Sequence, residues 1–304
     1  MTIDLITVSY GPDLARCRRL CATIDRHVRD HRAHLVIIPR RDLAAFRDLE
    51  GPKRRVVTIE SMMPGLYWQL PFSNWSVVAG LRPIPRLAAM RGWIVQQLVK
   101  LGTAAATDAE VLCMIDSDVQ FCRSFSARHF LHGDRVRLQT VAWDTPPSSR
   151  HPRWQATAEG MLGLAQAHFE RDYIGNLITW RRDHLLSMLN HIEETHGKPW
   201  YIVAGRGLRF SEYILYGNYV DRVLGGESGH VNECPHYCFE LWDQAEVAEL
   251  QRGDSRLKDE QVAVLIQSKL GLDEREEREL IAMLEAQDDP VSPCAETAPC
   301  ASRG

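Results

Sequence analysis

The sequence predicts an α/β protein in which helices flank a mainly parallel central sheet. Short, unbroken apolar runs recur along the chain, as is typical of strands buried on both faces of a parallel sheet. The segments between these runs carry apolar residues at helical spacing, and strands that alternate with helices form right-handed βαβ units. The run 111–115 also leads directly into Asp116-Ser117-Asp118, as expected when a buried strand ends at a ligand-binding edge.

The first elements alternate regularly. Residues 3–8 are a β-rich apolar run, and a turn at 9–12 separates it from a helix expected over 13–30, which Asp13 can cap. Apolar residues in that helix recur at positions such as Leu14 and Cys17, on one face. The same patterns predict a strand at 34–38, a short helix at 40–49 and a strand at 55–59.

The regular pattern fails between residues 61 and 91, where aromatic residues and prolines crowd together. Long loops in compact domains are usually functional or disordered, and the aromatic content argues against disorder. We expect this insertion, and 62–75 in particular, to cover a site or to hold an acceptor molecule. The alternative is a small satellite core beneath a loop.

Three candidate ligand-binding residues lie on, or directly before, a helix expected over 92–101. Trp93, Leu98 and Leu101 belong to its apolar stripe, whereas Gln97 and Lys100 leave it on other faces. Arg91 stands at its start. A cation from this helix can neutralise a diphosphate, and the candidates are Arg91 and Lys100. The alternative interpretation is that Arg91 and Lys100 are solvated surface residues.

Asp116 and Asp118 follow the buried strand 111–115. Their spacing in an extended chain lets both carboxylates reach the same side, and hard carboxylate oxygens suit Mg2+ or Mn2+ that bridges a diphosphate. Ser9 and Tyr10, at the end of the first strand, would lie beside them and could contact a nucleotide, with Tyr10 stacking on the base. The simpler interpretation is that the aspartates start a turn and that Tyr10 flanks one.

The second half continues with strands at 136–143 and 173–180 and helices at 154–169, 182–195, about 210–219, 259–270 and 274–286. Residues 121–130 are expected to be irregular, and Gly197 is expected to stop a helix. Ser211 can cap the helix that contains Glu212. Glu212 is either a partner of the helix macrodipole or a general base whose pKa is raised by desolvation.

His230 and His236 are candidate metal ligands. Either could complete the coordination of a metal held by the aspartates, and the spacing does not choose between them. Cys234-Pro-His-Tyr-Cys238 resembles half of a zinc site, but no second Cys/His pair at a suitable spacing completes it.

Bulk properties exclude several classes of protein. The 304 residues carry a net charge of −4, which does not indicate nucleic-acid binding. No secretory signal and no apolar run of membrane-spanning length is visible, so we expect a cytoplasmic protein with reduced cysteines that could still act at a membrane surface. We expect an α/β domain at 1–245, a helical extension at 246–286 and a disordered tail at 287–304. The oligomeric state is not encoded locally.

Four blocks of the sequence resemble the GT-A glycosyltransferases, and more narrowly a bacterial subfamily of glycosyltransferase-like proteins. They are Thr7-Val-Ser-Tyr10, Gly92-Trp-Ile-Val-Gln-Gln-Leu-Val-Lys-Leu101, Ile115-Asp-Ser-Asp118 and Ser211-Glu-Tyr-Ile-Leu-Tyr-Gly217. The likeness covers about residues 3–245 and implies a Rossmann-like, mainly parallel sheet. It also implies a nucleotide-sugar donor, a sugar or glycan acceptor and a divalent metal on the donor diphosphate.

The resemblance also implies individual roles. Asp118 matches the metal ligand, and Asp116 matches a residue that contacts the ribose or, through water, the metal. Glu212 falls where inverting members place the base that deprotonates the acceptor hydroxyl. A late histidine, here His230 or His236, often supplies a further ligand. The acceptor and the stereochemical outcome are not implied.

The sequence therefore predicts a metal-dependent glycosyltransferase, with three alternatives. A binding module of the same fold would keep the site without catalysis, because fold does not determine function. A phosphohydrolase would use Asp116 as nucleophile, but such enzymes normally place Thr or Val where this chain has Gln120. In a metal-independent transferase the aspartates would only form hydrogen bonds.

Overall fold

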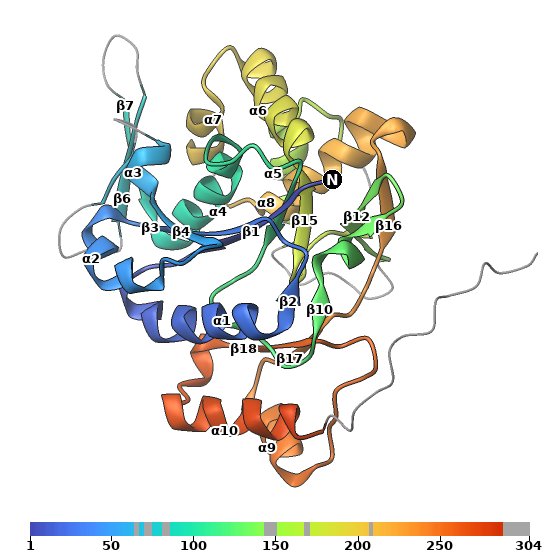
Figure 1. Ribbon diagram of the computed structural model, residues 1–304. Coiled ribbons are helices and arrows are strands. Elements are labelled where there is room, and N and C mark those ends of the chain that lie inside the picture. The colour runs from blue at the N-terminus through green and yellow to red at the C-terminus, as the bar shows by residue number, and fades with distance from the viewer. Residues whose placement is uncertain are drawn as a thin grey trace, which may run out of the picture.

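The computed structural model describes residues 1–63, 67–69, 75–80, 86–142, 151–166, 171–206 and 209–287, with the backbone alone at 67–69, 75–80, 86–91, 142, 206 and 227. It has the expected α/β class, with a mainly parallel central sheet flanked by helices (Figure 1). The strands of this sheet, in spatial order, are β15 (Ile178–Arg181), β8 (Val111–Met114), β1 (Ile3–Val8), β3 (Ala33–Ile38) and β4 (Arg54–Thr58).

The order of the strands creates a switch point between β1 and β8. From β1 the chain moves outward through β3 to β4, all in parallel, and then returns to place β8 on the other side of β1. Ligands of open α/β sheets bind in the crevice outside the carboxyl ends of the strands at such a reversal. The edge strand β15 is antiparallel to β8, so its first residue, Ile178, pairs with Met114 at that same edge.

The sheet is covered on both faces, as its unbroken apolar strands require. Alternate side chains of β1 point to opposite sides, so that Leu5 packs with Leu20 of α1 (Leu14–His27) while Ile6 packs with Leu98 of α4 (Gly92–Gly102). Figure 1 shows α1 below the sheet and α6 and α7 above it. The remaining helices are α2 (Leu43–Phe46), α3 (Ile59–Met62), α5 (His151–Met161), α6 (Arg182–His196), α7 (Trp200–Arg206), α8 (Glu212–Asn218), α9 (Gln244–Arg252) and α10 (Glu274–Glu285).

Smaller sheets surround the central sheet. β12 (Arg135–Gln139) lies beside β15, where Thr179 Oγ1 donates to the carbonyl of Arg137 at 2.6 Å, and it pairs in parallel with β16 (His230–Glu233). The shorter strands are β2 (Val28–Arg29), β9 (Val119–Phe121), β10 (Phe125–Ser126), β11 (Leu131–His132), β13 (Val141–Ala142), β14 (Arg171–Asp172), β17 (Cys238–Leu241) and β18 (Ala263–Ile266).

The C-terminal segment differs from its prediction. The helix expected over 259–270 is wrong, because Ala263–Ile266 form β18, which pairs with β17 and with β9 directly after the aspartates. Helix α9 was not predicted, although Asp243 and Glu246 form a capping box at its start. The prediction of a helix at 274–286 is confirmed by α10. Residues 288–304 of the expected tail lie outside the described residues.

Several other boundaries also differ. The insertion at 61–91 contains an antiparallel three-stranded sheet of β5 (Tyr67–Gln69), β6 (Trp75–Gly80) and β7 (Arg86–Arg91), where no strands were predicted. The strand expected at 173–180 is only Ile178–Arg181, because Leu177 bends the chain with a φ of 56°. The expected stop at Gly197 is confirmed by its left-handed φ of 59°. Among the described helices, none is both long and apolar enough to span a membrane.

Candidate functional site

The candidate site lies at the carboxyl edge of β1 and β8. Asp116 and Asp118 form the turn between β8 and β9, in which the amide of Val119 donates to the carbonyl of Asp116 at 3.1 Å. The carbonyl of Asp118 accepts a hydrogen bond from the amide of Ile266, at the end of β18. The aspartates are therefore turn residues, and this turn is positioned at the switch point.

Lys100, near the end of α4, joins three distant segments. Its ammonium donates to the Tyr213 hydroxyl at 2.7 Å and lies 2.9 Å from Asp116 Oδ1 and 3.1 Å from Glu212 Oε1. Burial alone would lower the pKa of Lys100, but Asp116, Tyr213 and Glu212 together raise it well above its ordinary value. Lys100 is therefore a fixed cation, and the three contacts use its three donors.

Glu212 is the first residue of α8. Ser211 caps this helix as predicted, because its hydroxyl accepts from the amide of Ile214 at 3.5 Å. The carboxylate is buried, and burial raises the pKa of Glu212 while Lys100 opposes the rise. A buried carboxylate with an elevated pKa, held beside a fixed cation, has the properties of a general base.

Aromatic packing fixes the orientation of α8. The Tyr216 ring stacks on Trp180 of β15 at a centroid distance of 5.2 Å, and Tyr213 meets Trp180 edge-on at 5.8 Å. On another side of the helix the Tyr173 ring lies directly against Gly217, where an added Cβ would come within 2.1 Å of the ring. Gly217 therefore lets Tyr173 and α8 approach each other closely.

Asp118 has a buried carboxylate oxygen that is available as an acceptor. Its Oδ1 has no hydrogen-bond partner among the described residues. Burial, followed by the charge of Asp116, raises the pKa of Asp118 to about 7. The side chain of Asp116 is 44% exposed, so a ligand can reach this pair from solvent. The two carboxylates fit the binding of a hard divalent cation with open positions for substrate oxygens.

The pair alone does not complete a metal site. Across the described ranges, no set of three or more His, Cys, Asp and Glu side chains is arranged to hold a metal ion. Any further ligands would therefore come from a substrate, from water, from a side chain that moves or from residues outside the described ranges.

The structure does not bring His230 to the aspartates. Its Nδ1 donates to the carbonyl of Val136 at 3.0 Å, and its Nε2 lies 2.9 Å from the Tyr216 hydroxyl. That hydroxyl also accepts from the amide of Arg181, which pairs with Val111 at the beginning of β8. His230 therefore lies at the opposite end of β8 from Asp116, with both ring nitrogens occupied.

His236 lies on the carboxyl side instead. It follows the carboxyl end of β16, and its Nε2 is 3.6 Å from the Cys234 thiol. Two residues later, burial raises the pKa of the Cys238 thiol, and Asp118 is one of the charges that add to the rise. Cys238, at the start of β17, is therefore within electrostatic reach of the site, whereas the side chain of His236 is exposed.

The other predicted ligand-binding residues have different surroundings. Ser9 is buried, and its hydroxyl has no hydrogen-bond partner among the described residues. Tyr10 lies at the edge, where burial and Asp13 raise its pKa. Gln97 is buried on α4, and neither atom of its amide has a hydrogen-bond partner among the described residues. The side chain of Arg91 is outside the described part of the chain.

The sequence interpretation missed Asp13, Arg16 and Tyr213. Asp13 was expected to cap α1, but its side chain makes no cap hydrogen bond. Burial raises the pKa of Asp13, Arg16 opposes the rise and Asp116 adds to it, so these groups act on each other electrostatically. An acidic residue shortly after the first strand was the signal available in the sequence.

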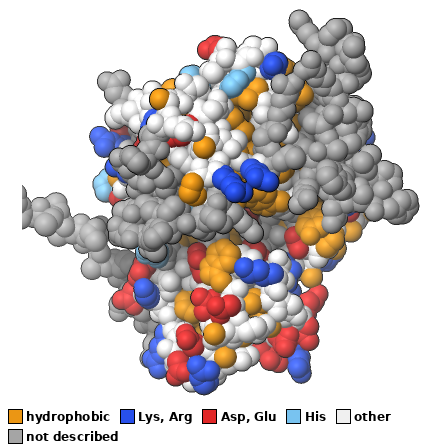
Figure 2. Space-filling model, turned by 180° about the vertical axis from the view of Figure 1, so that it is seen from behind, with side chains coloured by type: hydrophobic (Ala, Val, Ile, Leu, Met, Phe, Trp, Pro, Cys, Tyr) orange, Lys and Arg blue, Asp and Glu red, His pale blue; other side chains and the backbone are white. Residues whose placement is uncertain are grey.

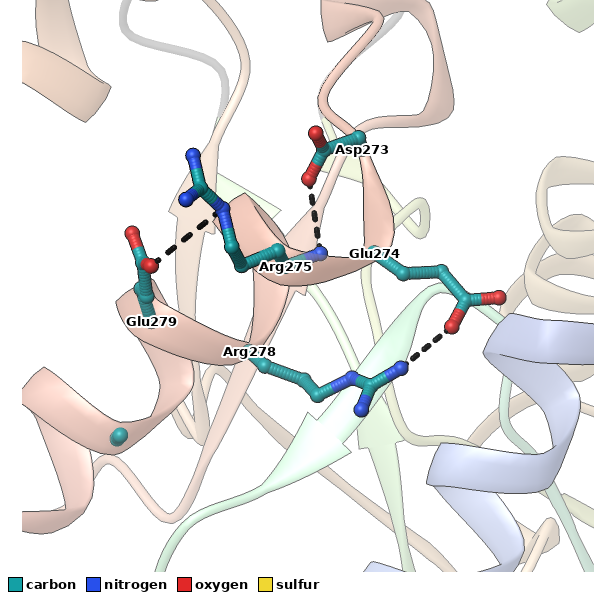
Figure 3. Close-up of a pocket in the computed structure, with 6 residues that line it drawn as sticks. Asp273, Glu274, Arg275, Arg278 and Glu279 are labelled. Atoms are coloured by element: carbon teal, nitrogen blue, oxygen red, sulfur yellow. Dashed lines mark hydrogen bonds and ion pairs between the residues drawn. The ribbon is translucent and has the colours of Figure 1, made fainter.

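A shallow depression on α10 is not a candidate site. Its charged side chains pair with one another, Arg278 with Glu274 at 2.6 Å and Arg275 with Glu279 at 3.7 Å (Figure 3). Figure 2 shows acidic and basic side chains interspersed over the part of the surface formed by the C-terminal helices. This arrangement is typical of a solvated surface.

One family model matches the chain. It spans residues 2–285 and is described as a family of unknown function, DUF6492. The match includes every element that contributes to the site, and it also includes α9 and α10. A search of curated proteins finds no match.

Proposed function

The chain belongs to the DUF6492 family, and we propose that it is a metal-dependent glycosyltransferase that moves a sugar from a nucleotide-diphosphate sugar to an acceptor hydroxyl. The observation that carries the proposal is the convergence on Lys100. One buried ammonium contacts both Asp116 of the Asp-Ser-Asp turn and Glu212 at the start of α8. A cation-binding pair and a potential base thus lie on either side of one fixed charge.

The topology supports a GT-A-like fold. The strand order β4-β3-β1-β8 places the aspartates outside the switch point, and an antiparallel strand, β15, follows β8 in the sheet. A nucleotide bound in this crevice would lie against Ser9 and Tyr10 at the end of β1. Gln97, a buried amide on the same helix as Lys100, is the remaining described candidate for a donor contact.

Asp116 and Asp118 would hold Mn2+ or Mg2+. Oδ1 of Asp118, which has no hydrogen-bond partner in the described part of the chain, would be the best-placed ligand. The metal would neutralise charge on the leaving diphosphate. His236, on the carboxyl side of the sheet, is the better placed of the two histidines to join the aspartates. Lys100 adds a fixed positive charge beside the same diphosphate without reorganisation during the reaction.

Glu212 would act as the general base. The acceptor hydroxyl attacks C1 of the donor sugar, a new C1–O bond forms, and the bond between C1 and the diphosphate oxygen breaks. The hydroxyl proton passes to Glu212, whose burial raises its affinity for a proton. The neighbouring Lys100 keeps this carboxylate charged before the reaction.

The acceptor would bind above the site. The aromatic insertion at 62–75 is the predicted acceptor surface, since flat rings pack on the apolar faces of sugars. Its side chains beyond Met63 lie outside the described residues. A second aromatic contact is described: Trp93, which is 47% exposed at the start of α4, lies against Trp154 at a ring-centroid distance of 5.5 Å.

A thermal-stability panel tests the proposal. UDP, GDP, CDP and dTDP would each be added with and without Mn2+, because a ligand of the folded state raises the melting temperature by mass action. The proposal expects a metal-dependent shift with one nucleotide that is lost in Asp118→Ala. A shift that survives without metal would favour the metal-independent alternative. No shift with any nucleotide would favour a glycan-binding module or a phosphohydrolase.

A further inference from the structure

Arg16 connects the candidate site to the C-terminal helix α10. It lies in the first turn of α1, and its Nε and Nη2 donate to Glu277 Oε1 at 2.9 and 2.6 Å. The other oxygen of Glu277 accepts from Arg19. Glu277 is only 3% exposed, and a carboxylate so deeply buried is stable because two guanidinium groups pair with it.

The backbone of Arg16 lies beside the Asp-Ser-Asp turn, because its carbonyl accepts a hydrogen bond from the Gln120 side chain, two residues after Asp118, at 3.3 Å. Arg16 Nη1 lies 3.8 Å from Asp13 Oδ1, which is an ion pair but too long for a hydrogen bond. Burial raises the pKa of both Asp13 and Asp118, and the charge of Arg16 opposes the rise in each. The positive charge of Arg16 therefore stabilises the carboxylates of Asp13 and Asp118, while its hydrogen bonds to Glu277 fix its position.

A second protein cation would strengthen the binding of a diphosphate at this site. The charge of Lys100 is already shared between Asp116 and Glu212, and its three donors are used. Arg16 Nη1 has no hydrogen-bond partner among the described residues, so its N–H groups are available for an anion. A planar guanidinium with free N–H groups suits a phosphate oxygen.

We propose that Arg16 is a further donor-binding residue, which contacts a phosphate oxygen of the donor diphosphate through Nη1, and that Glu277 of α10 positions it. The inference rests on the proposed function, since it names a contact to that donor. It also gives α10, which lies far from the aspartates in the sequence, a role in the site.

The same pair of helices supplies a matched control. Glu285 of α10 contacts Arg26 near the end of α1 at 3.4 Å, so it links the two helices away from the aspartates. Replacing Glu285 therefore removes a contact between α10 and α1 without disturbing Arg16. Glu274 and Arg278 pair with each other within α10 (Figure 3).

Calorimetric titration of the full chain tests the inference. The probes are UDP, GDP, CDP, dTDP, the four corresponding nucleosides and inorganic diphosphate, each with Mg2+. The proteins are wild type, Arg16→Met, Glu277→Gln and Glu285→Gln, and their thermal unfolding confirms that each is folded. If Glu277→Gln does not fold, Arg16→Met still tests the contact itself.

We expect Arg16→Met to weaken binding of the preferred nucleoside diphosphate at least about tenfold, the effect of one lost charge-assisted hydrogen bond. Binding of the matching nucleoside should not change. Glu277→Gln should weaken diphosphate binding by a smaller factor, and Glu285→Gln should have no effect. Equal affinity of wild type and Arg16→Met for a nucleoside diphosphate would overturn the inference and leave the proposed function intact.

A different result would overturn the proposed function and leave the anion contact of Arg16 intact. If wild type binds inorganic diphosphate through Arg16 but binds none of the four nucleotides, the anion contact stands and the nucleotide-sugar donor fails. If wild type binds neither inorganic diphosphate nor any nucleotide, both proposals are overturned.

Discussion

Lys100 Nζ lies 3.1 Å from Glu212 Oε1, although the two residues belong to helices that are far apart in the sequence. Both side chains are buried, so each charge depends on the other for compensation. Asp116 shares the same ammonium. This shared charge links the turn after β8 to the start of α8.

Lys100→Met should destabilise the protein by about 3–5 kcal/mol, because it leaves the Glu212 carboxylate buried without a partner. Glu212→Gln in the same chain should restore part of that loss, since the neutral amide needs no counter-charge. Denaturant unfolding of the two single variants and the double variant measures the coupling. Strictly additive losses would show that the two charges do not compensate each other.

Asp118→Asn should stabilise the metal-free protein at pH 8. Burial raises the pKa of Asp118 from 3.8 to about 7. The contribution of this side chain to the free energy of unfolding is therefore fully present below pH 3.8 and is lost as pH rises through 7. Replacing the carboxyl group removes a cost of at most about 4 kcal/mol. The variant should also lose any stabilisation by Mn2+, which thermal unfolding with and without the ion measures. A less stable metal-free variant would contradict the burial argument.

His230→Gln should flatten the acid limb of the stability profile. Burial, with His184 next, lowers the pKa of His230 from 6.5 to about 3. The neutral His230 side chain therefore contributes stability that is fully present above pH 6.5 and is lost as pH falls toward 3. The loss is at most about 5 kcal/mol. Chemical unfolding between pH 4 and 8 measures this slope, with the exposed His132→Gln as control. Loss of metal binding in His230→Gln would contradict its placement at the far end of β8.

Gly217→Ala should destabilise the protein although alanine is the better helix former by about 1 kcal/mol. The added Cβ would come within 2.1 Å of the Tyr173 ring, which cannot move away freely because the Tyr173 hydroxyl donates to Asp221 Oδ2 at 2.7 Å. We expect a net loss of about 1–3 kcal/mol. Gly160→Ala, on α5 with open space around its Cβ position, is the control and should be neutral or stabilising. Equal behaviour of the two variants would mean that Tyr173 does not constrain α8.

The strands of the sheet and the Asp-Ser-Asp turn could be predicted because their signals are local. Apolar runs gave β1, β3, β4 and β8, and the aspartates followed the last of them directly. The same kind of signal failed for β18, where a four-residue apolar run was assigned to a helix. A short apolar run does not distinguish the two structures, and its pairing with β9 is set by residues far away in the sequence.

The composition of the site could be predicted only in part. Lys100, Asp116 and Glu212 each carried a local signal, but their meeting point depends on how α4, β8 and α8 pack. The choice between His230 and His236 depends on the direction of β16, which places one histidine at its start and the other beyond its end. Arg16 gave no signal because its partner, Glu277, lies on the last helix.

Release of a nucleoside diphosphate from a sugar donor tests the central claim most directly. Wild type, Asp118→Ala and Glu212→Gln would be incubated with a panel of nucleotide-sugars and Mn2+, with and without candidate glycan acceptors. We predict metal-dependent release from one donor, abolished in Asp118→Ala and reduced about 10²–10⁴-fold in Glu212→Gln, which should still bind the nucleotide. Nucleotide binding without any release, unchanged by Glu212→Gln, would contradict catalysis and identify the chain as a binding module.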